Sequence, residues 1–262
     1  MVFDTPVPFR EAVRQLAAKK LIPTSMTSQQ LQQVNKEIMR RSFTSAQTTI
    51  EGLLERYKKG VMSIINPEQV AREGAEFPVT EGFNPASLRG FVKDYLGEIG
   101  YTPNEEEEGS ITDLSSDKRI DLVVKTNVQL AHGAGRFIQQ NNDADVVDLW
   151  PALELVRFES REHPRDWEHR WTIAAQVAGD AVAAGILDKT GRMVALKSSG
   201  IWQALGDAPD GLGNPYPPFA FNSGMWTEEI DRQEAEELGL LESGEKAEPA
   251  EFDLSSLFGG AE

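Results

Sequence analysis

The strongest helical pattern in the sequence is DKRIDLVVKTNVQLAHGAGRFIQQNN, residues 117–142. Its apolar residues recur at intervals of three and four, the spacing that lines up side chains on one face of an α-helix. Ser116 is well placed to cap this helix, and Asp117 favours its N-terminal end. Gly133 and Gly135 predict an interruption of the helix, at a point where backbones could pack closely. The predicted stripe consists of Ile120, Val123, Val124, Asn127, Val128 and Ala131.

Residues 1–65, which precede this helix, also predict helices with one apolar face each. The first carries its stripe from Phe9 to Leu16, and Pro23 closes it. A second helix is expected from about Ser28, running past Phe43 into a third apolar stretch over residues 50–61. Helices of this kind need partners for their apolar faces. The N-terminal part is therefore expected to be a helical domain.

Between these helices and residue 117 the sequence predicts a loop, a helix and a second loop. Residues 66–84 are rich in Pro, Gly and Asn, which favours irregular structure. Asn84 as cap and Pro85 in the first turn predict a helix that ends at Gly97 and Gly100. TPNEEEEGS, residues 102–110, is expected to be a loop, and it lacks the alternating ligand spacing of a calcium site.

After residue 150 the pattern changes to short strands and short helices. LELVRF (153–158) and MVAL (193–196) favour strands, and Asp166-Trp167 is expected to open a helix that reaches Ala178. A helical turn is predicted over 200–205, an extended Pro- and aromatic-rich segment over 214–226, and a last helix over 230–241. The predicted fold class is α+β, mainly α.

A boundary near residues 145–152 divides the chain into parts. We expect a helical domain over 1–150, a small α+β module over 151–241 and a mobile acidic tail over 242–262. Near its end the tail holds the apolar stretch FDLSSLF (252–258), which could dock on a partner or belong to a solubilising tail.

Charge is unevenly distributed along the 262 residues. The formal net charge is −16, yet residues 1–60 hold ten Lys and Arg against five Asp and Glu. The overall charge argues against general coating of nucleic acid, whereas a local basic face remains compatible with DNA binding. A solvated helix face is the alternative interpretation. The candidate portal or DNA contacts are Arg14, Lys19, Lys20, Lys36, Arg40, Arg41, Lys58 and Lys59.

Several classes of protein are excluded by composition. No cysteine is present, which excludes disulfides and thiolate chemistry. No apolar run is long enough to span a bilayer, and the N-terminus does not read as a secretory signal, so we expect no membrane insertion and synthesis in a cytoplasm. Neither a phosphate-binding glycine loop nor a nucleophile elbow occurs, and the sequence predicts no cofactor and no metal site.

Two segments could still carry an activity. In RFESREHPRDWEHRW (157–171), His163, Asp166 and His169 could serve a hydrolase or transferase, but Pro164 prevents a shared helix face. The favoured interpretation is a salt-bridged turn that positions Trp167 and Trp171 in the core. Aromatic residues near segment 214–226 could hold a peptide or stack on bases, or could close a core, which is the favoured interpretation. These residues are Trp202, Tyr216, Phe219, Phe221 and Trp226.

The order of elements resembles the phage Mu F-like minor head protein family, also called phage head morphogenesis proteins. The opening helix ends in a Lys19-Lys20-Leu21 turn, and LELVRFESRE leads into a C-terminal module that contains NPYPPFAFNSGM. The positions that match the family's motifs are Thr126, Asn127, Ala131, Gly135, Arg136, Pro217 and Pro218. The chain lacks the Cys-Arg-Cys element of many relatives, so thiol- or metal-linked chemistry does not carry over.

The resemblance implies a structural protein rather than an enzyme. It implies a minor capsid component inside the head of a tailed bacteriophage, near the portal, that is made in the host cytoplasm. Its partners would be the portal protein, other capsid proteins and packaged double-stranded DNA. Its roles would be head assembly and viral genome packaging or exit.

Overall fold

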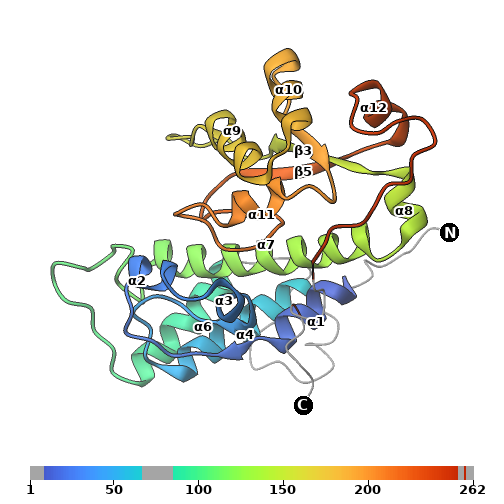
Figure 1. The fold of residues 1–262 in the computed structure, drawn as a ribbon. Helices are drawn as coiled ribbons and strands as arrows, with labels where there is room; N and C mark the ends of the chain where they lie inside the picture. The colour runs from blue at the N-terminus through green and yellow to red at the C-terminus, as the bar shows by residue number, and fades with distance from the viewer. Residues whose placement is uncertain (1–8, 67–84, 253–256, 258–262) are drawn as a thin grey trace. The chain divides into compact units, whose positions relative to one another are not determined.

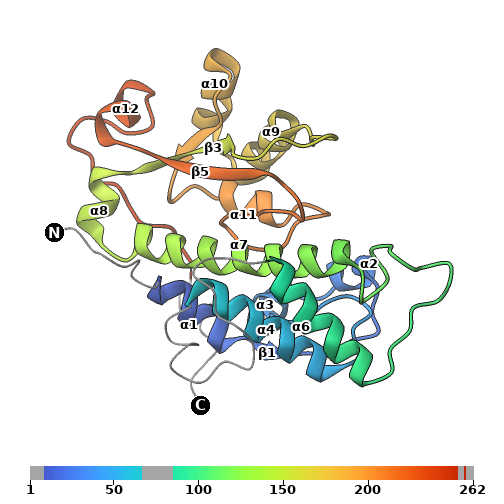
Figure 2. The ribbon, with the colours of Figure 1, turned by 180° about the vertical axis from the view of Figure 1, so that it is seen from behind.

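The computed structural model describes residues 9–66, 85–252 and 257. These residues form two compact units, shown with their element labels in Figures 1 and 2. Unit 1 comprises residues 1–135 together with 255–262, and unit 2 comprises residues 136–254. The predicted fold class is confirmed: the described chain is mainly helical, with little strand.

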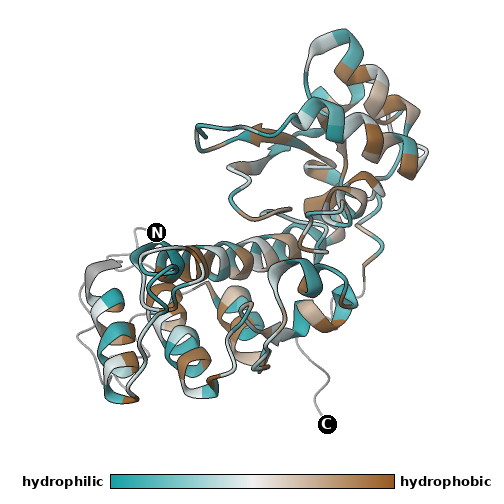
Figure 3. Ribbon diagram, turned by 90° about the vertical axis from the view of Figure 1, so that its left-hand side faces the viewer, coloured by the Kyte–Doolittle hydropathy of each residue, from teal (hydrophilic) through white to brown (hydrophobic). Residues whose placement is uncertain are grey.

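Unit 1 is built from helices. Its elements are α1 (Arg10–Ala18), β1 (Lys20–Leu21), α2 (Ser28–Gln32), α3 (Lys36–Arg41), β2 (Ser42–Phe43), α4 (Glu51–Ile65), α6 (Pro85–Glu98) and the first part of α7 (Asp117–Asn141). Figure 3 shows hydrophobic and hydrophilic segments alternating along these helices, as expected where each helix buries one face. The core side chains come from α1, α4, α6 and α7 and include Leu16, Leu54, Val61, Val92 and Val124.

The helix predicted from residue 28 onward is wrong in its extent. Two short helices, α2 and α3, replace it, and the parallel pairing of β1 with β2 follows. The break arises because the Asn35 side chain accepts a hydrogen bond from the Glu37 N–H (2.8 Å), which starts α3 afresh. Ile38 of α3 is 54% exposed, so this short helix does not bury a continuous apolar face.

The predicted interruption at Gly133 and Gly135 is also wrong. Helix α7 runs unbroken from Asp117 to Asn141, and the Arg119 N–H bonds the Ser116 hydroxyl as expected for a cap. Close packing explains Gly135 without a break: a Cβ there would lie 2.8 Å from the Ala12 backbone nitrogen of α1. The glycine therefore serves contact between helices while the helix tolerates its lower propensity.

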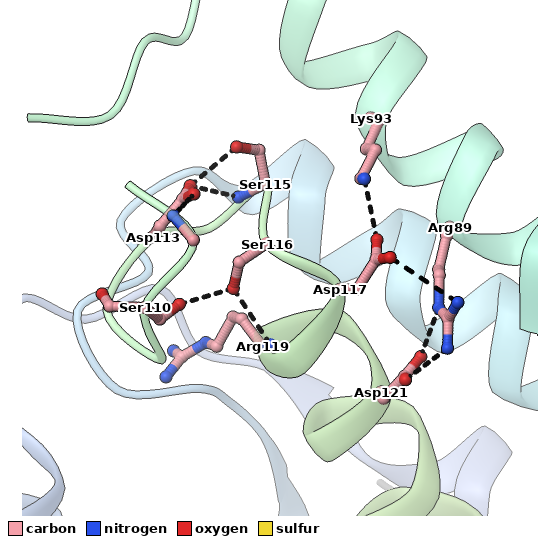
Figure 4. A network of polar contacts seen from close by, with 10 residues as sticks. Arg89, Lys93, Ser110, Asp113, Ser115, Ser116, Asp117, Arg119 and Asp121 are labelled. Atoms are coloured by element: carbon pink, nitrogen blue, oxygen red, sulfur yellow. Dashed lines mark hydrogen bonds and ion pairs between the residues drawn. The ribbon is translucent and has the colours of Figure 1, made fainter. Parts of the chain in front are cut away.

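Helix α6 begins at Pro85 and ends before Gly100, whose φ is +72°, as predicted. The predicted cap Asn84 and the irregular segment 67–84 lie outside the described residues. Residues 102–110 form a loop as predicted, and ion pairs connect α6 with the start of α7. The guanidinium of Arg89 binds both carboxylate oxygens of Asp121 (2.8 and 2.5 Å), and the Lys93 ammonium lies 2.7 Å from Asp117 (Figure 4).

Unit 2 is a small sheet with helices on both faces. After the end of α7 its elements are α8 (Ala144–Leu149), β3 (Ala152–Arg157), α9 (Trp167–Ala178), α10 (Ala181–Thr190), β4 (Val194–Leu196), α11 (Ile201–Gly206), β5 (Met225–Ile230) and α12 (Arg232–Glu237). The strand order is β4-β3-β5, and both pairings are antiparallel. Leu153 and Leu155 of β3 pack with α9 and α11, whereas Ala152 packs with Ala235 of α12.

Three elements of unit 2 were not predicted: helix α8, helix α10 and strand β5. Helix α10 has a Gly185 in an Ala-rich run, so its periodicity is weak, and the capping of Ala183 N–H by Asp180 (2.9 Å) starts it. Strand β5 continues the extended segment 214–226 to Ile230 by pairing with β3. The last helix was predicted over 230–241 but spans only Arg232–Glu237, because Ile230 belongs to β5 and Asp231 is the cap.

The predicted boundary at residues 145–152 lies inside unit 2, because the last part of α7 contacts that unit. The rings of Phe137 and Tyr216 are 5.4 Å apart, and the Lys197 ammonium donates to the Gln140 carbonyl (3.3 Å). The units consequently divide within α7, between Gly135 and Arg136.

Residues 242–252, which we call the C-terminal strap, pack against the rest of unit 2. The Ala247 N–H donates to Asp148 (3.2 Å), the Ala250 N–H donates to Asn141 (2.9 Å), and the Phe252 ring meets Phe137 edge to face at 5.5 Å. The predicted mobility of the tail falls, for 253–256 and 258–262, outside the described residues.

Candidate functional site

The candidate site is the basic N-terminal part of unit 1, whose eight predicted contact residues the structure distributes over four elements. Arg14 and Lys19 come from α1 and the turn after it, and Lys20 from β1. Lys36, Arg40 and Arg41 belong to α3, and Lys58 and Lys59 to α4. These residues do not all have the same access to a ligand.

Lys19 and Lys58 serve the internal structure of unit 1. The Lys58 ammonium donates to the carbonyls of Ala17 (2.9 Å) and Lys19 (2.6 Å), which satisfies acceptors at the end of α1. Lys19 is only 6% exposed, and burial, with repulsion from Lys58, lowers its pKa to about 8. Burial lowers the pKa of Lys58 as well. These two side chains are therefore less accessible to a ligand than the exposed members of the predicted set.

The remaining six predicted contacts lie at or near the surface. Arg14, Lys20 and Lys59 are exposed, and Lys36, Arg40 and Arg41 are partly exposed. Two carry intrahelical ion pairs: Arg41 with Glu37 at 2.9 Å and Lys59 with Glu55 at 3.3 Å. Exposed pairs of this type are weak and are screened by salt, so they leave both cations able to exchange partners.

A buried cation that the sequence did not single out organises the loop between β2 and α4. Arg119 of α7 is 7% exposed, and its guanidinium donates to the Ser45 hydroxyl (2.6 Å) and to the Ala46 carbonyl. Burial lowers the pKa of this guanidinium. Figure 4 shows Arg119 beside the Ser110–Ser116 turn, where the Ser116 hydroxyl donates to the Ser110 carbonyl (2.5 Å). Its role is structural, because these bonds fix the loop between β2 and α4 to helix α7.

The 157–171 segment does not assemble a catalytic group. The His163 side chain is 92% exposed, and Asp166 accepts the His169 N–H (2.9 Å) as the cap of α9. The favoured interpretation, a salt-bridged turn, is confirmed: Arg165 and Arg170 both bind Asp210, at 2.9 and 2.8 Å. Trp167 and Trp171 are 3% and 0% exposed.

The aromatic residues divide between core and surface. Trp202, Tyr216 and Phe219 are buried, and the Trp171 and Trp202 rings meet edge to face at 5.4 Å. The core interpretation is confirmed for these three, whereas Phe221 is 41% exposed and Trp226 is partly exposed.

The family-motif positions make structural contacts. Thr126 is buried, and the Asn127 amide donates to the Val123 carbonyl (2.8 Å) within α7. The Arg136 guanidinium lies 5.9 Å from the Trp226 ring centre. Pro217 and Pro218 are buried and joined by a cis peptide bond, beside the Asn214 amide, which donates to the Pro218 carbonyl (3.1 Å).

Two features, a membrane-spanning helix and a metal site, are not found in the described part of the chain. No helix there is both long and apolar enough to cross a membrane. Among the same residues, no three or more His, Asp or Glu side chains gather as a metal site.

Comparison with known proteins yields one distant similarity. The chain is 26% identical over 171 residues to the protein described as "Putative capsid assembly protein F" of Escherichia phage Mu. The match covers 63% of this chain and 35% of that protein, so the chain spans about a third of its relative's length. No protein-family model matches, and no solved structure matches. The similarity agrees with the family resemblance of the motifs and connects the chain with a phage capsid protein.

Proposed function

We propose that this chain is a structural minor head protein of a tailed bacteriophage, located inside the head near the portal. There it aids head assembly and the packaging or exit of DNA. The observation that carries the proposal is the similarity, over 171 residues, to a capsid assembly protein of phage Mu. The chain would be made in the bacterial host cytoplasm and retained in the virion.

The geometry supports a structural role over the enzymatic alternative. His163 faces solvent, while Asp166 is engaged in capping α9, so the proposed acid–base group has no common centre. Little aromatic surface is likewise exposed for the peptide-binding alternative, because Tyr216 and Phe219 are buried in unit 2.

We assign the parts of the chain as follows. Residues 1–150 would face the portal or DNA, residues 151–241 would be a small head-morphogenesis module, and residues 242–262 would be an acidic tail. The surface contacts that we retain are Arg14, Lys20, Lys36, Arg40, Arg41 and Lys59. A basic segment next to packaged DNA makes physical sense, since phosphates supply affinity that does not depend on sequence.

Mass spectrometry of purified particles tests the proposal. We expect the protein at a few copies per particle, in full particles and in particles that have lost their DNA, and in portal-containing fragments of disrupted heads. The major capsid protein is the internal reference for copy number. Absence from particles, together with normal assembly, DNA content and infectivity of phage that lack the gene, would refute the proposal.

A further inference from the structure

The Arg56 guanidinium of α4 is held on an aromatic platform. It lies 4.5 Å from the centre of the Phe91 ring and 4.7 Å from the centre of the Tyr95 ring, and both rings belong to α6. Contacts of this kind are worth about 0.5–2 kcal/mol, depending on exposure, and they restrict the rotamers of a long side chain. Arg56 is thus positioned before any ligand arrives.

Two glycines of α4 allow this platform to form. A Cβ at Gly52, one turn before Arg56, would lie 2.0 Å from the Tyr95 hydroxyl oxygen. A Cβ at Gly60, one turn after Arg56, would lie 2.3 Å from a methyl carbon of Leu88. The two helices lie side by side in Figures 1 and 2. Their close approach brings the rings of α6 under the Arg56 side chain.

The charge of Arg56 has no counter-ion within the described residues. The other two cations of α4 are engaged, Lys58 with carbonyls at the end of α1 and Lys59 with Glu55. Arg56 is half-buried, and no carboxylate of the described chain lies within ion-pair distance of it. In a chain with 42 acidic and 26 basic residues, an arginine that is positioned but unpaired has its planar fork of N–H donors available for an external anion.

We infer that Arg56 is a phosphate-contact residue for double-stranded DNA on the surface of unit 1. A guanidinium fork matches two phosphate oxygens, and a pre-positioned side chain loses less conformational entropy when it binds. The excess of basic residues in 1–60, which include Arg56, complements an anionic partner, and the proposed function makes packaged DNA that partner. Lys59, three residues along the same helix, lies on the neighbouring surface and provides a second cation for the repeating backbone charge. This inference rests on the proposed function, which places unit 1 close to DNA.

The test measures the binding of the full chain to fluorescein-labelled duplexes of two unrelated sequences, by anisotropy, between about 50 and 200 mM salt. Arg56→Met keeps an apolar side chain on the two rings and removes the charge. We expect it to weaken binding about tenfold for both sequences. The slope of log affinity against log salt should fall by about 0.9, as for one lost phosphate contact.

Two further variants separate charge from structure. Arg56→Lys keeps the charge and loses the planar guanidinium, so its affinity for DNA should lie between those of the wild type and Arg56→Met. If Arg56→Met fails to fold, this variant tests the phosphate contact instead. Glu55→Gln leaves Arg56 in place and frees Lys59, so it should not weaken binding. Circular dichroism melting establishes that each variant is folded.

Other outcomes overturn the inference. A wild-type chain that does not bind duplex DNA at low salt would do so, as would folded Arg56 variants with unchanged affinity and salt slope. If polyglutamate binds with the same dependence on Arg56 while DNA does not, the site recognises an acidic protein surface instead. In each of these cases the protein can still be found in particles, so the minor head proposal survives separately. If the protein is absent from particles but binds DNA in a way that depends on Arg56, the minor head proposal fails and this inference still holds.

Discussion

At the scale of single residues, burial decides which charged side chains of unit 1 can meet a ligand. Lys19 and Lys20 are neighbours in the sequence, yet the first is 6% exposed and the second lies at the surface. No spacing rule separates them, because the distinction arises where α4 passes the end of α1 and presents Lys58 to its carbonyls. Charged residues can therefore be counted from the sequence, but their access to a partner cannot.

The lowered pKa of Lys19 predicts a pH-dependent stability. The folded-state pKa of Lys19, about 8, is below the ordinary lysine value of 10.5, so the folded chain binds fewer protons than the unfolded chain between these pH values. The free energy of unfolding should thus rise with pH, by about 2 kcal/mol between pH 8 and 9.5. Burial raises the pKa of Tyr57, so the stability that this neutral side chain contributes is lost only above pH 10. Measurements below pH 10 therefore report on Lys19 without interference from Tyr57.

Urea unfolding of the wild type and of Lys19→Met between pH 7 and 9.5 measures this effect. We expect Lys19→Met to be the more stable protein at pH 7 and to lose most of that advantage by pH 9.5. Lys59→Met, which changes an exposed lysine of α4, is the matched control and should follow the wild-type curve. If the free energy of unfolding of Lys19→Met changes with pH in parallel with that of the wild type, the Lys19 ammonium is not desolvated in the folded state.

At the scale of elements, glycines inside helices show that a low helix propensity does not by itself end a helix in the folded chain. Gly133 and Gly135 lower helix propensity, and from this the sequence predicted a break. The helix persists because α7 packs along unit 1 through residues such as Ile120, Val124 and Ala131, and packing of this kind outweighs about 1 kcal/mol per glycine. The close approach of α1 gives the reason for a glycine at 135.

Substitution of two helical glycines should give effects of opposite sign. Gly135→Ala places a Cβ 2.8 Å from the Ala12 backbone nitrogen, which cannot move without α1, so we expect a loss of about 1–3 kcal/mol in stability. Gly90→Ala in α6 meets nothing within 4 Å and should stabilise by about 0.5–1 kcal/mol through helix propensity.

Chemical denaturation of both variants, with circular dichroism at the helix wavelength, provides the comparison. Equal effects in the two proteins would contradict the packing argument, since propensity alone treats both glycines alike.

At the scale of the whole molecule, the acidic C-terminal strap packs against the rest of unit 2, which is itself acidic. Contacts other than charge attraction hold it: two strap N–H groups bond Asp148 and Asn141, and the Phe252 ring meets Phe137. The Arg232 guanidinium adds a bond to the Glu245 carbonyl (2.7 Å) and holds Asp148, whose pKa is lowered by the Ala247 N–H and by Arg232.

The strap should consequently resist salt and depend on its aromatic anchor. Phe252→Ala removes an edge-to-face pair worth about 1 kcal/mol and should increase hydrogen exchange at the Ala247 and Ala250 amides. Glu248→Gln, at an exposed position of the strap, should leave exchange at these amides unchanged, and so should high salt. Release of the strap by salt alone would instead identify charge as its anchor.

The features that could be predicted from the amino-acid sequence follow from local chemistry. The spacing of apolar residues identified α1, α4, α6 and α7, and the Ser116 and Asp166 caps located two helix starts. Side chains act on their own helix within a few residues, so these features need no knowledge of the rest of the chain. The resemblance of motifs also led to the phage head family, in agreement with the similarity to the phage Mu protein.

The tertiary structure alone decided the features that depend on distant contacts. Strand β5 exists because β3 pairs with it, and Lys19 is buried because α4 lies beside the end of α1. Arg56 stands apart from the other cations only because Gly52 and Gly60 admit the side chains of α6. Each of these relations joins residues that are far apart in the chain, and burial and pairing energies depend on that proximity in space, which no local pattern encodes.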